Sequence, residues 1–194
     1  MESITLVAAG WSSGLNAYLT VLILGLSGRF GWVDTPVALQ HNGVLMVAGA
    51  AFAVEFVIDK IPLLDSAWDL VHTLVRPVVG GMVGSAIAGS ALGRPEAFAI
   101  AALLALTGHT AKATTRLAIN MSPEPVTNVI ASFSEDGIVL GLVTFAMVYP
   151  VVSLVLGSVA VVGSILVTLL VWRLARRGVR RVLSMFHHEA DEYV

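Results

Sequence analysis

Several uninterrupted apolar stretches, each about 20 residues long, constrain this chain more than any other feature. A helix of that length crosses the roughly 30 Å hydrocarbon core of a bilayer. The composition agrees, because 57% of the residues are hydrophobic, 12% are charged and the mean hydropathy is +0.87. A soluble domain is roughly 25% charged, and a β-barrel would need short alternating segments that the sequence lacks. The sequence therefore predicts an all-α membrane protein.

Six stretches predict transmembrane helices, separated by turns rich in proline, glycine and asparagine. Their positions are residues 5–28, 44–58, a third stretch from residue 63, and residues 95–120, 126–148 and 151–172. We expect one membrane domain over residues 1–182 and a polar tail over residues 183–194. The chain has no cysteine, which excludes disulfides and thiolate metal sites, and we expect no bound cofactor.

The segment VEFVIDKIPLLDSAWDLVHTLVRP, residues 54–77, places many ionisable residues between two apolar runs. Ionisable residues within a membrane are costly, and by default they indicate a functional site. Glu55 and Asp59 share one helix face before Pro62 interrupts the helix. The next helix carries a polar stripe at steps of four, three and four, made of Asp65, Asp69, His72 and Arg76.

Two later spans carry further polar faces. In residues 95–120 the polar side chains recur at steps of three, four and four, and they are His109, Lys112, Arg116 and Asn120. In residues 126–148 the carboxylates Glu135 and Asp136 lie in the first half of the span. We expect these two carboxylates to pair with the bases of the preceding span, Arg116 with Glu135 above all. The carboxylates that end the second span reach the same side and would complete a buried mixed-charge cluster.

The first span contains Asn16 on a polar face, and Gly10 and Gly14 form a G-x-x-x-G pair that allows close helix approach. Asn16 either packs against a neighbouring helix or lines a polar cavity. A second series of small residues at steps of four is Gly81, Ser85, Gly89 and Gly93. That series indicates close packing, either within one chain or in a homo-oligomer, for which we favour a dimer.

The chain divides near residues 92–95 into two blocks of three spans, residues 5–92 and 93–172. Each block has a helix with a polar stripe, a proline-broken segment and a carboxylate pair, which favours two inverted repeats with broken helices. The basic residues are concentrated after the last span, at Arg173, Arg176, Arg177, Arg180 and Arg181. Because basic segments face the cytoplasm and attract anionic lipid head groups, six spans would place both termini in the cytoplasm.

Four motifs, taken in order, resemble one family. They are SSGLNAYLTVLILGLSGRFGW, the segment over residues 54–77, HTAKATTRLAINMSPEP and SFSEDGIVLGL. Together they resemble bacterial membrane proteins catalogued as a domain of unknown function, family 4126, over about residues 8–148. The E-x-x-x-D-K-I-P and S-P-E-P segments are the most specific parts. The family has no assigned activity, so the resemblance implies a polytopic helical protein of the inner membrane and transfers no catalytic residue.

Carboxylates outnumber bases in the predicted cluster. The six acids are Glu55, Asp59, Asp65, Asp69, Glu135 and Asp136, and the four bases are Lys60, Arg76, Lys112 and Arg116. The excess leaves room for a proton or a metal cation, so we expect a cation-coupled transporter or small channel for an ion or solute. Alternatively, the charges reach head groups or cap helices in a membrane scaffold. A carrier of an anionic lipid, or an enzyme acting on one, is a further alternative, although neither an enzyme nor a nucleic-acid binder is the function that we expect.

Overall fold

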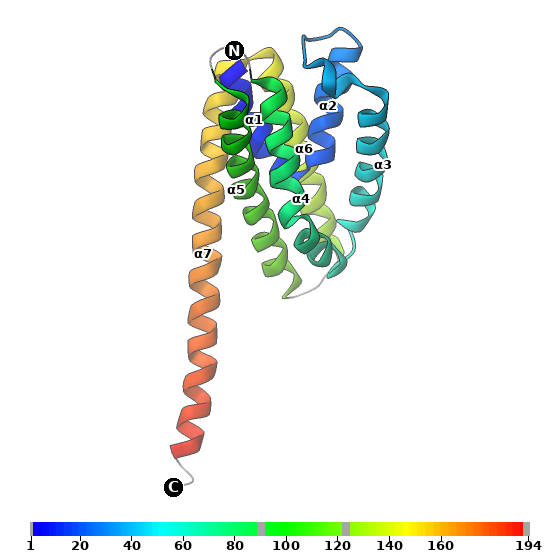
Figure 1. Ribbon diagram of the computed structural model, residues 1–194. Helices are drawn as coiled ribbons and strands as arrows, with labels where there is room; N and C mark the ends of the chain where they lie inside the picture. The colour runs from blue at the N-terminus through cyan, green and yellow to red at the C-terminus, as the bar shows by residue number, and fades with distance from the viewer. Residues whose placement is uncertain (1, 89–91, 122–124, 192–194) are drawn as a thin grey trace.

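The computed structural model describes residues 2–88, 92–121 and 125–191, with backbone only at residues 2–4, 179 and 181–191. All regular structure in these ranges is helical, as predicted. The elements are α1 (Glu2–Leu15), α2 (Ala17–Arg29), the 3-10 turn η1 (Val37–Gln40), α3 (Asn42–Ile58), α4 (Leu64–Ile87), α5 (Arg94–Asn120), α6 (Pro125–Val148) and α7 (Pro150–Asp191). Figure 1 shows them as one bundle from which α7 projects.

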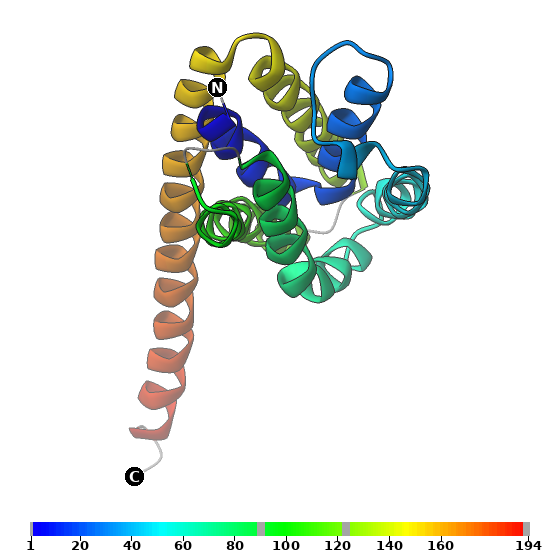
Figure 2. The same cartoon turned by 45° about the horizontal axis from the view of Figure 1, so that its top comes forward.

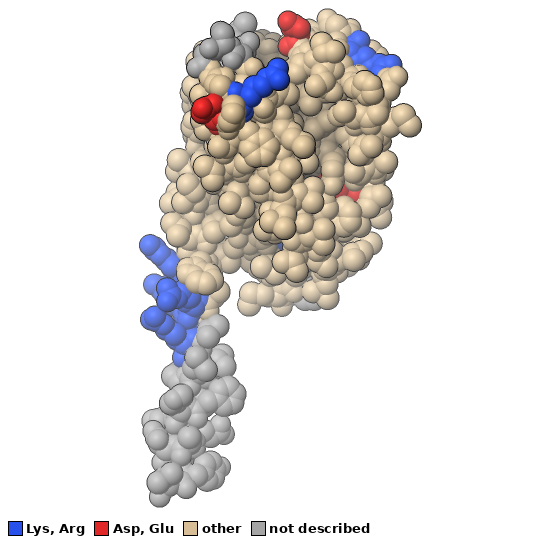
Figure 3. All heavy atoms as spheres, in the orientation of Figure 1, with Lys and Arg blue, Asp and Glu red and all other residues tan. Residues whose placement is uncertain are grey.

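Four helices are long and apolar enough to cross a membrane: α4, α5, α6 and the part of α7 up to Gly178. The apolar helices α2 and α3 are shorter, at 13 and 17 residues. On the face shown in Figure 3, charged residues gather at the upper end and on the projecting helix, and the band between them is almost entirely uncharged. The chain is therefore a multi-pass helical membrane protein.

The predicted first span, residues 5–28, is a helical hairpin. Asn16 adopts an extended conformation, with φ −149° and ψ 98°, and separates α1 from α2. Its side-chain oxygen accepts a hydrogen bond from the Leu19 N–H at 2.9 Å, so it caps the start of α2. The base of the hairpin lies at one end of the bundle, where Thr5 and Thr35 line the same cavity of about 460 Å³. The prediction of one continuous span was wrong, because an asparagine cap begins a new helix inside the apolar run.

The remaining helices alternate in direction (Figure 1). We call the end where α1 begins and α2 ends the outer end, and the end where α5 ends and α6 begins the inner end. From α3 to α7 each helix runs opposite to the one before it, so α1 begins at one end of the bundle and α7 ends beyond the other (Figure 1). The predicted topology placed both termini on one side and disagrees with this arrangement, because it counted the hairpin as a crossing.

Small residues let α1 and α4 approach α5 closely. A Cβ on Gly14 would clash with the backbone oxygen of Ala105, and a Cβ on Gly80 would lie 2.6 Å from the Cβ of Ala105. One on Gly81 would lie 2.7 Å from the Phe98 ring. The predicted close packing is thus present within one chain, and Gly89, a later member of the series, lies outside the described residues.

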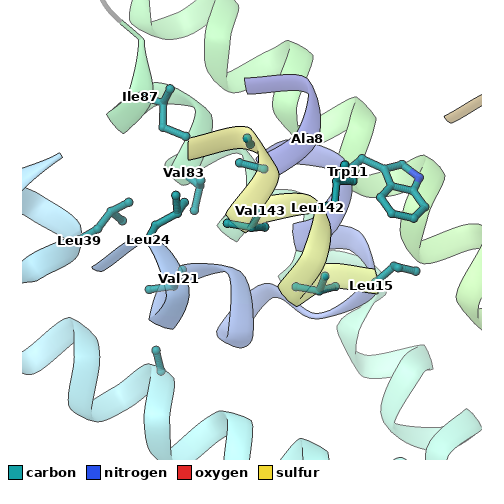
Figure 4. Close-up of a cluster of buried hydrophobic side chains, with 14 residues drawn as sticks. Ala8, Trp11, Leu15, Val21, Leu24, Leu39, Val83, Ile87, Leu142 and Val143 are labelled. Carbon is teal, nitrogen blue, oxygen red and sulfur yellow. The ribbon is translucent and has the colours of Figure 1, made fainter. Parts of the chain in front are cut away.

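The outer half of the bundle has an apolar core, shown in Figure 4. Its buried side chains come mostly from α1, α2, α4 and α6, with Leu39 from η1 and Ala48 from α3, and they include Ala8, Trp11, Val21, Leu24, Val83, Ile87, Leu142 and Val143. The Trp11 indole N–H donates to Ser164 Oγ on α7 at 2.9 Å. Lipid tails are as apolar as these side chains, so van der Waals packing holds this half together.

Helix α7 continues far beyond the bundle (Figure 2). The predicted span, residues 151–172, and the first part of the predicted tail form one helix that ends at Asp191. The side chains of Arg173, Arg176, Arg177 and Arg180 are exposed along it. The remaining side chains of the predicted tail, and that of Arg181, lie outside the described residues.

Candidate functional site

The predicted site residues lie between the hairpin tip and the inner end of the bundle. Ten of the thirteen are no more than 2% exposed: Asn16, Glu55, Asp59, Asp65, Asp69, His72, Arg76, His109, Lys112 and Arg116. The other three, Asn120, Glu135 and Asp136, are partly buried. Charges held at this depth must be paired, so their contacts define the site.

The tip of the hairpin places the C-terminal end of α1 beside two cations. Arg76 Nη1 donates to the carbonyl oxygen of Gly14 at 3.3 Å. Lys112 Nζ donates to the carbonyl oxygen of Leu15, also at 3.3 Å. The last carbonyls of a helix have no partner within it and carry partial negative charge. The helix break therefore supplies two backbone acceptors to a site otherwise made of side chains.

Asn16 links the hairpin tip to α6. While its oxygen caps α2, its amide Nδ2 donates to Asp136 Oδ1 at 3.0 Å. The residue is 1% exposed. It therefore belongs to the charged site, and both of its polar groups are used.

Arg76 on α4 is the central cation and is fully buried. Its Nη2 donates to Glu55 Oε1 on α3 at 2.8 Å. Its Nη1 lies 2.9 Å from Asp69 Oδ1, one pair within the stripe that the spacing predicted. The same Nη1 lies 2.8 Å from His109 Nδ1 on α5. One guanidinium thus joins three helices and two carboxylates.

The contact with Arg76 fixes the protonation of His109. A guanidinium only donates hydrogen bonds, so His109 Nδ1 must accept and carries no proton. The opposite nitrogen, Nε2, lies 3.1 Å from Thr73 Oγ1, which itself donates to the Asp69 carbonyl. The network therefore assigns a neutral imidazole protonated at Nε2.

His72, one turn before Arg76, faces the hairpin. Its Nδ1 lies 2.9 Å from the Trp68 carbonyl, an acceptor, so Nδ1 carries the proton. Its Nε2 lies 2.9 Å from the hydroxyl of Tyr18, the second residue of α2. The hairpin therefore contacts the polar stripe of α4 through a side chain as well as through its backbone.

Lys112 lies among oxygens from α1, from α3 and its C-cap residue, and from α6. Its Nζ is 3.4 Å from Glu55 Oε1, 3.5 Å from Glu135 Oε2 and in its shortest contact with Asp59 Oδ2. With the Leu15 carbonyl these make four oxygen neighbours. Three of the four are carboxylate oxygens, so the ammonium lies in a strongly negative surrounding.

Arg116 forms the pair that the sequence predicted. Its Nη2 and Nε contact Glu135 Oε2 and Oε1 at 2.6 and 3.1 Å, a two-point arrangement typical of strong arginine–carboxylate pairs. Its Nη1 donates to Asn128 Oδ1 at 2.7 Å and lies 3.5 Å from Asp65 Oδ2. Towards the inner end, Asn120 Nδ2 donates to Asp65 Oδ1 at 2.8 Å.

Lys60 is the fourth base and lies at the edge of the cluster, in the turn between α3 and α4. Its Nζ is 3.1 Å from the centre of the Phe56 ring and 4.5 Å from that of Phe133, and it donates to Ser132 Oγ at 3.3 Å. Burial lowers the pKa of this ammonium, and Asp136 opposes the effect. Lys60 therefore bridges α3 and α6 without a direct carboxylate contact.

Five buried carboxylate oxygens accept no hydrogen bond from any group that the structure describes: Glu55 Oε2, Asp59 Oδ1, Asp65 Oδ2, Asp69 Oδ1 and Asp69 Oδ2. Two of them lie in ion pairs, Asp69 Oδ1 with Arg76 and Asp65 Oδ2 with Arg116. Buried polar atoms in proteins nearly always have a partner. Within the described ranges, no three His, Asp or Glu side chains are arranged as ligands of one metal ion.

A family model matches residues 4–176, which include the hairpin, α3 to α6 and the whole charged cluster. The chain belongs to the family described as Domain of unknown function (DUF4126). The resemblance inferred from the motifs is thereby confirmed. No curated protein and no solved structure matches the chain. A function for this DUF4126 member must therefore be proposed from the geometry of the charged cluster.

Sequence reasoning missed several members of the site. Asn128 and Ser132 lie eight and four residues before Asp136 on one face of α6, so helical spacing could have found them. Tyr18 and Thr73 carried no such signal. Nor did the carbonyls of the hairpin tip, which become acceptors only because the helix ends there.

Proposed function

We propose that this protein is a small cation-coupled transporter whose ion site is the buried charge cluster. The observation that carries the proposal is the excess of six carboxylates over four bases, together with five buried carboxylate oxygens that accept no described hydrogen bond. An uncompensated buried carboxylate is strongly destabilising. Protons or a small cation would neutralise the excess, and their binding and release is the elementary step of a coupled transporter.

The broken helix supports the same proposal. Secondary transporters place their ion sites where helices are interrupted within the membrane, because the exposed helix ends supply acceptors and donors. Here the interruption at Asn16 adjoins Arg76, Lys112 and Asp136. The apolar core closes the outer half, so the site would exchange with the inner side in this conformation. The two inverted repeats stay part of this proposal.

We also propose a topology in the bacterial inner membrane. Helices α3 to α7 cross the bilayer, and the α1–α2 hairpin enters and returns on the outer side. The exposed arginines of α7 favour a cytoplasmic C-terminus near anionic head groups, whereas Arg29 and Arg94 lie at the outer end. An epitope tag at the N-terminus should be accessible in spheroplasts, and a C-terminal tag only after permeabilisation. Equal protection of both tags would contradict the topology.

Flux through reconstituted protein tests transport directly. Proteoliposomes loaded with a pH-sensitive dye should show proton movement when an inward sodium, potassium or lithium gradient is imposed. Glu135→Gln should abolish the movement, because it removes a carboxylate of the cluster. Glu96→Gln, an exposed carboxylate at the outer end of α5, is the matched control and should behave as wild type. Folded wild-type protein that behaves like empty liposomes under every gradient would refute the proposal.

A membrane scaffold is the second candidate. It is favoured by the ion pairs of Arg76, Lys112 and Arg116, which tie together α3, α4, α5 and α6 as a purely structural network would. The open glycine face at Gly137 and Gly141 of α6 would suit a second copy in a homodimer. If the protein is a scaffold, ion flux should equal that of empty liposomes at every gradient. Mutation of the charged cluster should then lower stability and change nothing else.

A further inference from the structure

We propose that Asp69 on α4 is the proton-binding residue of the charged cluster, and that it alternates between a neutral carboxyl and a carboxylate that pairs with Arg76. The inference rests on the proposed transport function, because it names the residue that binds the coupling proton. It concerns proton binding at one side chain, however, so it can be tested without any measurement of flux.

Asp69 differs from the other five carboxylates of the cluster in its hydrogen bonds. It is 2% exposed, and neither of its carboxylate oxygens accepts a hydrogen bond from any group that the structure describes. Each of the other five accepts at least one, from Arg76, Lys112, Arg116, Asn16 or Asn120. An ion that is buried without donors is costly, whereas a neutral carboxyl is far less costly to bury. Within the cluster, Asp69 is therefore the side chain best suited to hold a proton.

The ion pair with Arg76 does not supply the missing donor. Arg76 Nη1 lies 2.9 Å from Asp69 Oδ1, but this nitrogen carries two hydrogens and no more. Its hydrogen bonds go to the Gly14 carbonyl at 3.3 Å and to His109 Nδ1 at 2.8 Å. Its partner nitrogen, Nη2, donates to Glu55, whose carboxylate balances the charge of the guanidinium. This arrangement fits a neutral Asp69 beside an arginine that is already paired.

The other charges that act on Asp69 come from neighbouring helices and oppose one another. Lys112 on α5 favours the carboxylate form, as Arg76 does. Asp59, the C-cap residue of α3, and Glu135 on α6 favour the neutral form. With attraction and repulsion both present, the burial of Asp69 and its lack of donors distinguish it from the rest of the cluster.

Loss of the proton would link Asp69 to the hairpin tip. The proton would pass from the carboxyl to water that reaches the site from the inner end. The carboxylate would then be a third acceptor for the two hydrogens of Arg76 Nη1, and hydrogen bonds to an ionised acceptor are roughly twice as strong as neutral ones. The Gly14 carbonyl makes the longer of the two existing bonds, so it is the acceptor that would be released. Proton release would therefore loosen the contact between α1 and α4.

The test is infrared difference spectroscopy of the full-length protein in detergent, recorded between about pH 5 and about pH 8, where exposed carboxyls are mostly ionised. The carbonyl stretch of a neutral carboxylic acid is distinct from the bands of a carboxylate, so the spectrum reports protonation directly. Wild type should show a carboxylic-acid band that disappears as the pH rises, and Asp69→Asn should lack it. Asp136→Asn, the same change at a partly exposed carboxylate of the cluster, is the control and should keep the band.

A wild-type spectrum without the band, or the same band in Asp69→Asn, would overturn the proposal. A band that Asp69→Asn removes but that pH does not change would show a permanently neutral residue and would overturn the exchange. If Asp69→Asn does not fold, Asp69→Glu keeps a carboxyl and should shift the frequency of the band, and an unshifted band would refute the assignment. The expected band without ion flux would retain the proton site and reject the transporter, and flux without the band would do the reverse.

Discussion

The outer and inner halves of the bundle are built from the same helices but are held together by different interactions. Along α4, the buried positions towards the outer end are Gly80, Gly84 and Val83, whereas those towards the inner end include Asp69 and Arg76. The outer half depends on close approach between small and apolar side chains. The inner half depends on ions that are stable only as a set, because each carries a cost that its partners offset. We therefore expect independent residues in the outer half and strongly coupled residues in the inner half.

The largest effect should follow the loss of the central cation. Arg76→Met leaves Glu55 and Asp69 without their guanidinium and should lower the free energy of unfolding by about 3–5 kcal/mol. Chemical unfolding in detergent measures this loss. Arg94→Met, at an exposed outer position, is the control and should change stability by less than about 0.5 kcal/mol. Equal losses of unfolding free energy in Arg76→Met and Arg94→Met would contradict the claim that the buried cation stabilises the protein more than an exposed one.

A cavity in the outer half should cost somewhat less and add to distant changes. Leu24→Ala removes a side chain that is 2% exposed and should destabilise the protein by about 2–5 kcal/mol through lost packing. Combined with Arg76→Met, its loss should add to within about 0.5 kcal/mol, since the two side chains share no partner. Strong coupling between these residues, measured by the same unfolding assay, would show that the halves do not behave separately.

The sequence predicted the inner half better than the outer half. Charged residues recur at helical spacing, which predicts the stripe from Asp65 to Arg76. The pairing of Arg116 with Glu135 follows from the order of the two residues and their depth in the predicted spans. The hairpin could not be read in this way, because the apolar run continues on both sides of Asn16. Hydropathy gives the length of an apolar segment, but it does not show whether the chain turns back within that segment. The break depends on a cap and on donors from α4 and α5 that are distant in sequence.

The hairpin tip should show the smallest stability effect. Asn16→Ala removes the cap of α2 and the hydrogen bond to Asp136, and it should cost about 0.5–2 kcal/mol. Asn16→Asp preserves the cap but places a second carboxylate beside Asp136, so it should be no better than alanine. If Asn16→Asp unfolds like wild type, the contact with Asp136 contributes nothing to the tip.

The most direct test of the central claim compares stability and flux in one charge-balanced variant. Arg116→Met and Glu135→Gln should each lower the free energy of unfolding by about 3–5 kcal/mol, because each leaves a buried charge without its nearest partner. The double variant should lose clearly less than the sum, with a coupling of about 0.5–3 kcal/mol. If the inner half is an ion site, the double variant should regain stability and still carry no cation-dependent proton flux in liposomes. Wild-type flux in that stable double variant would contradict the account.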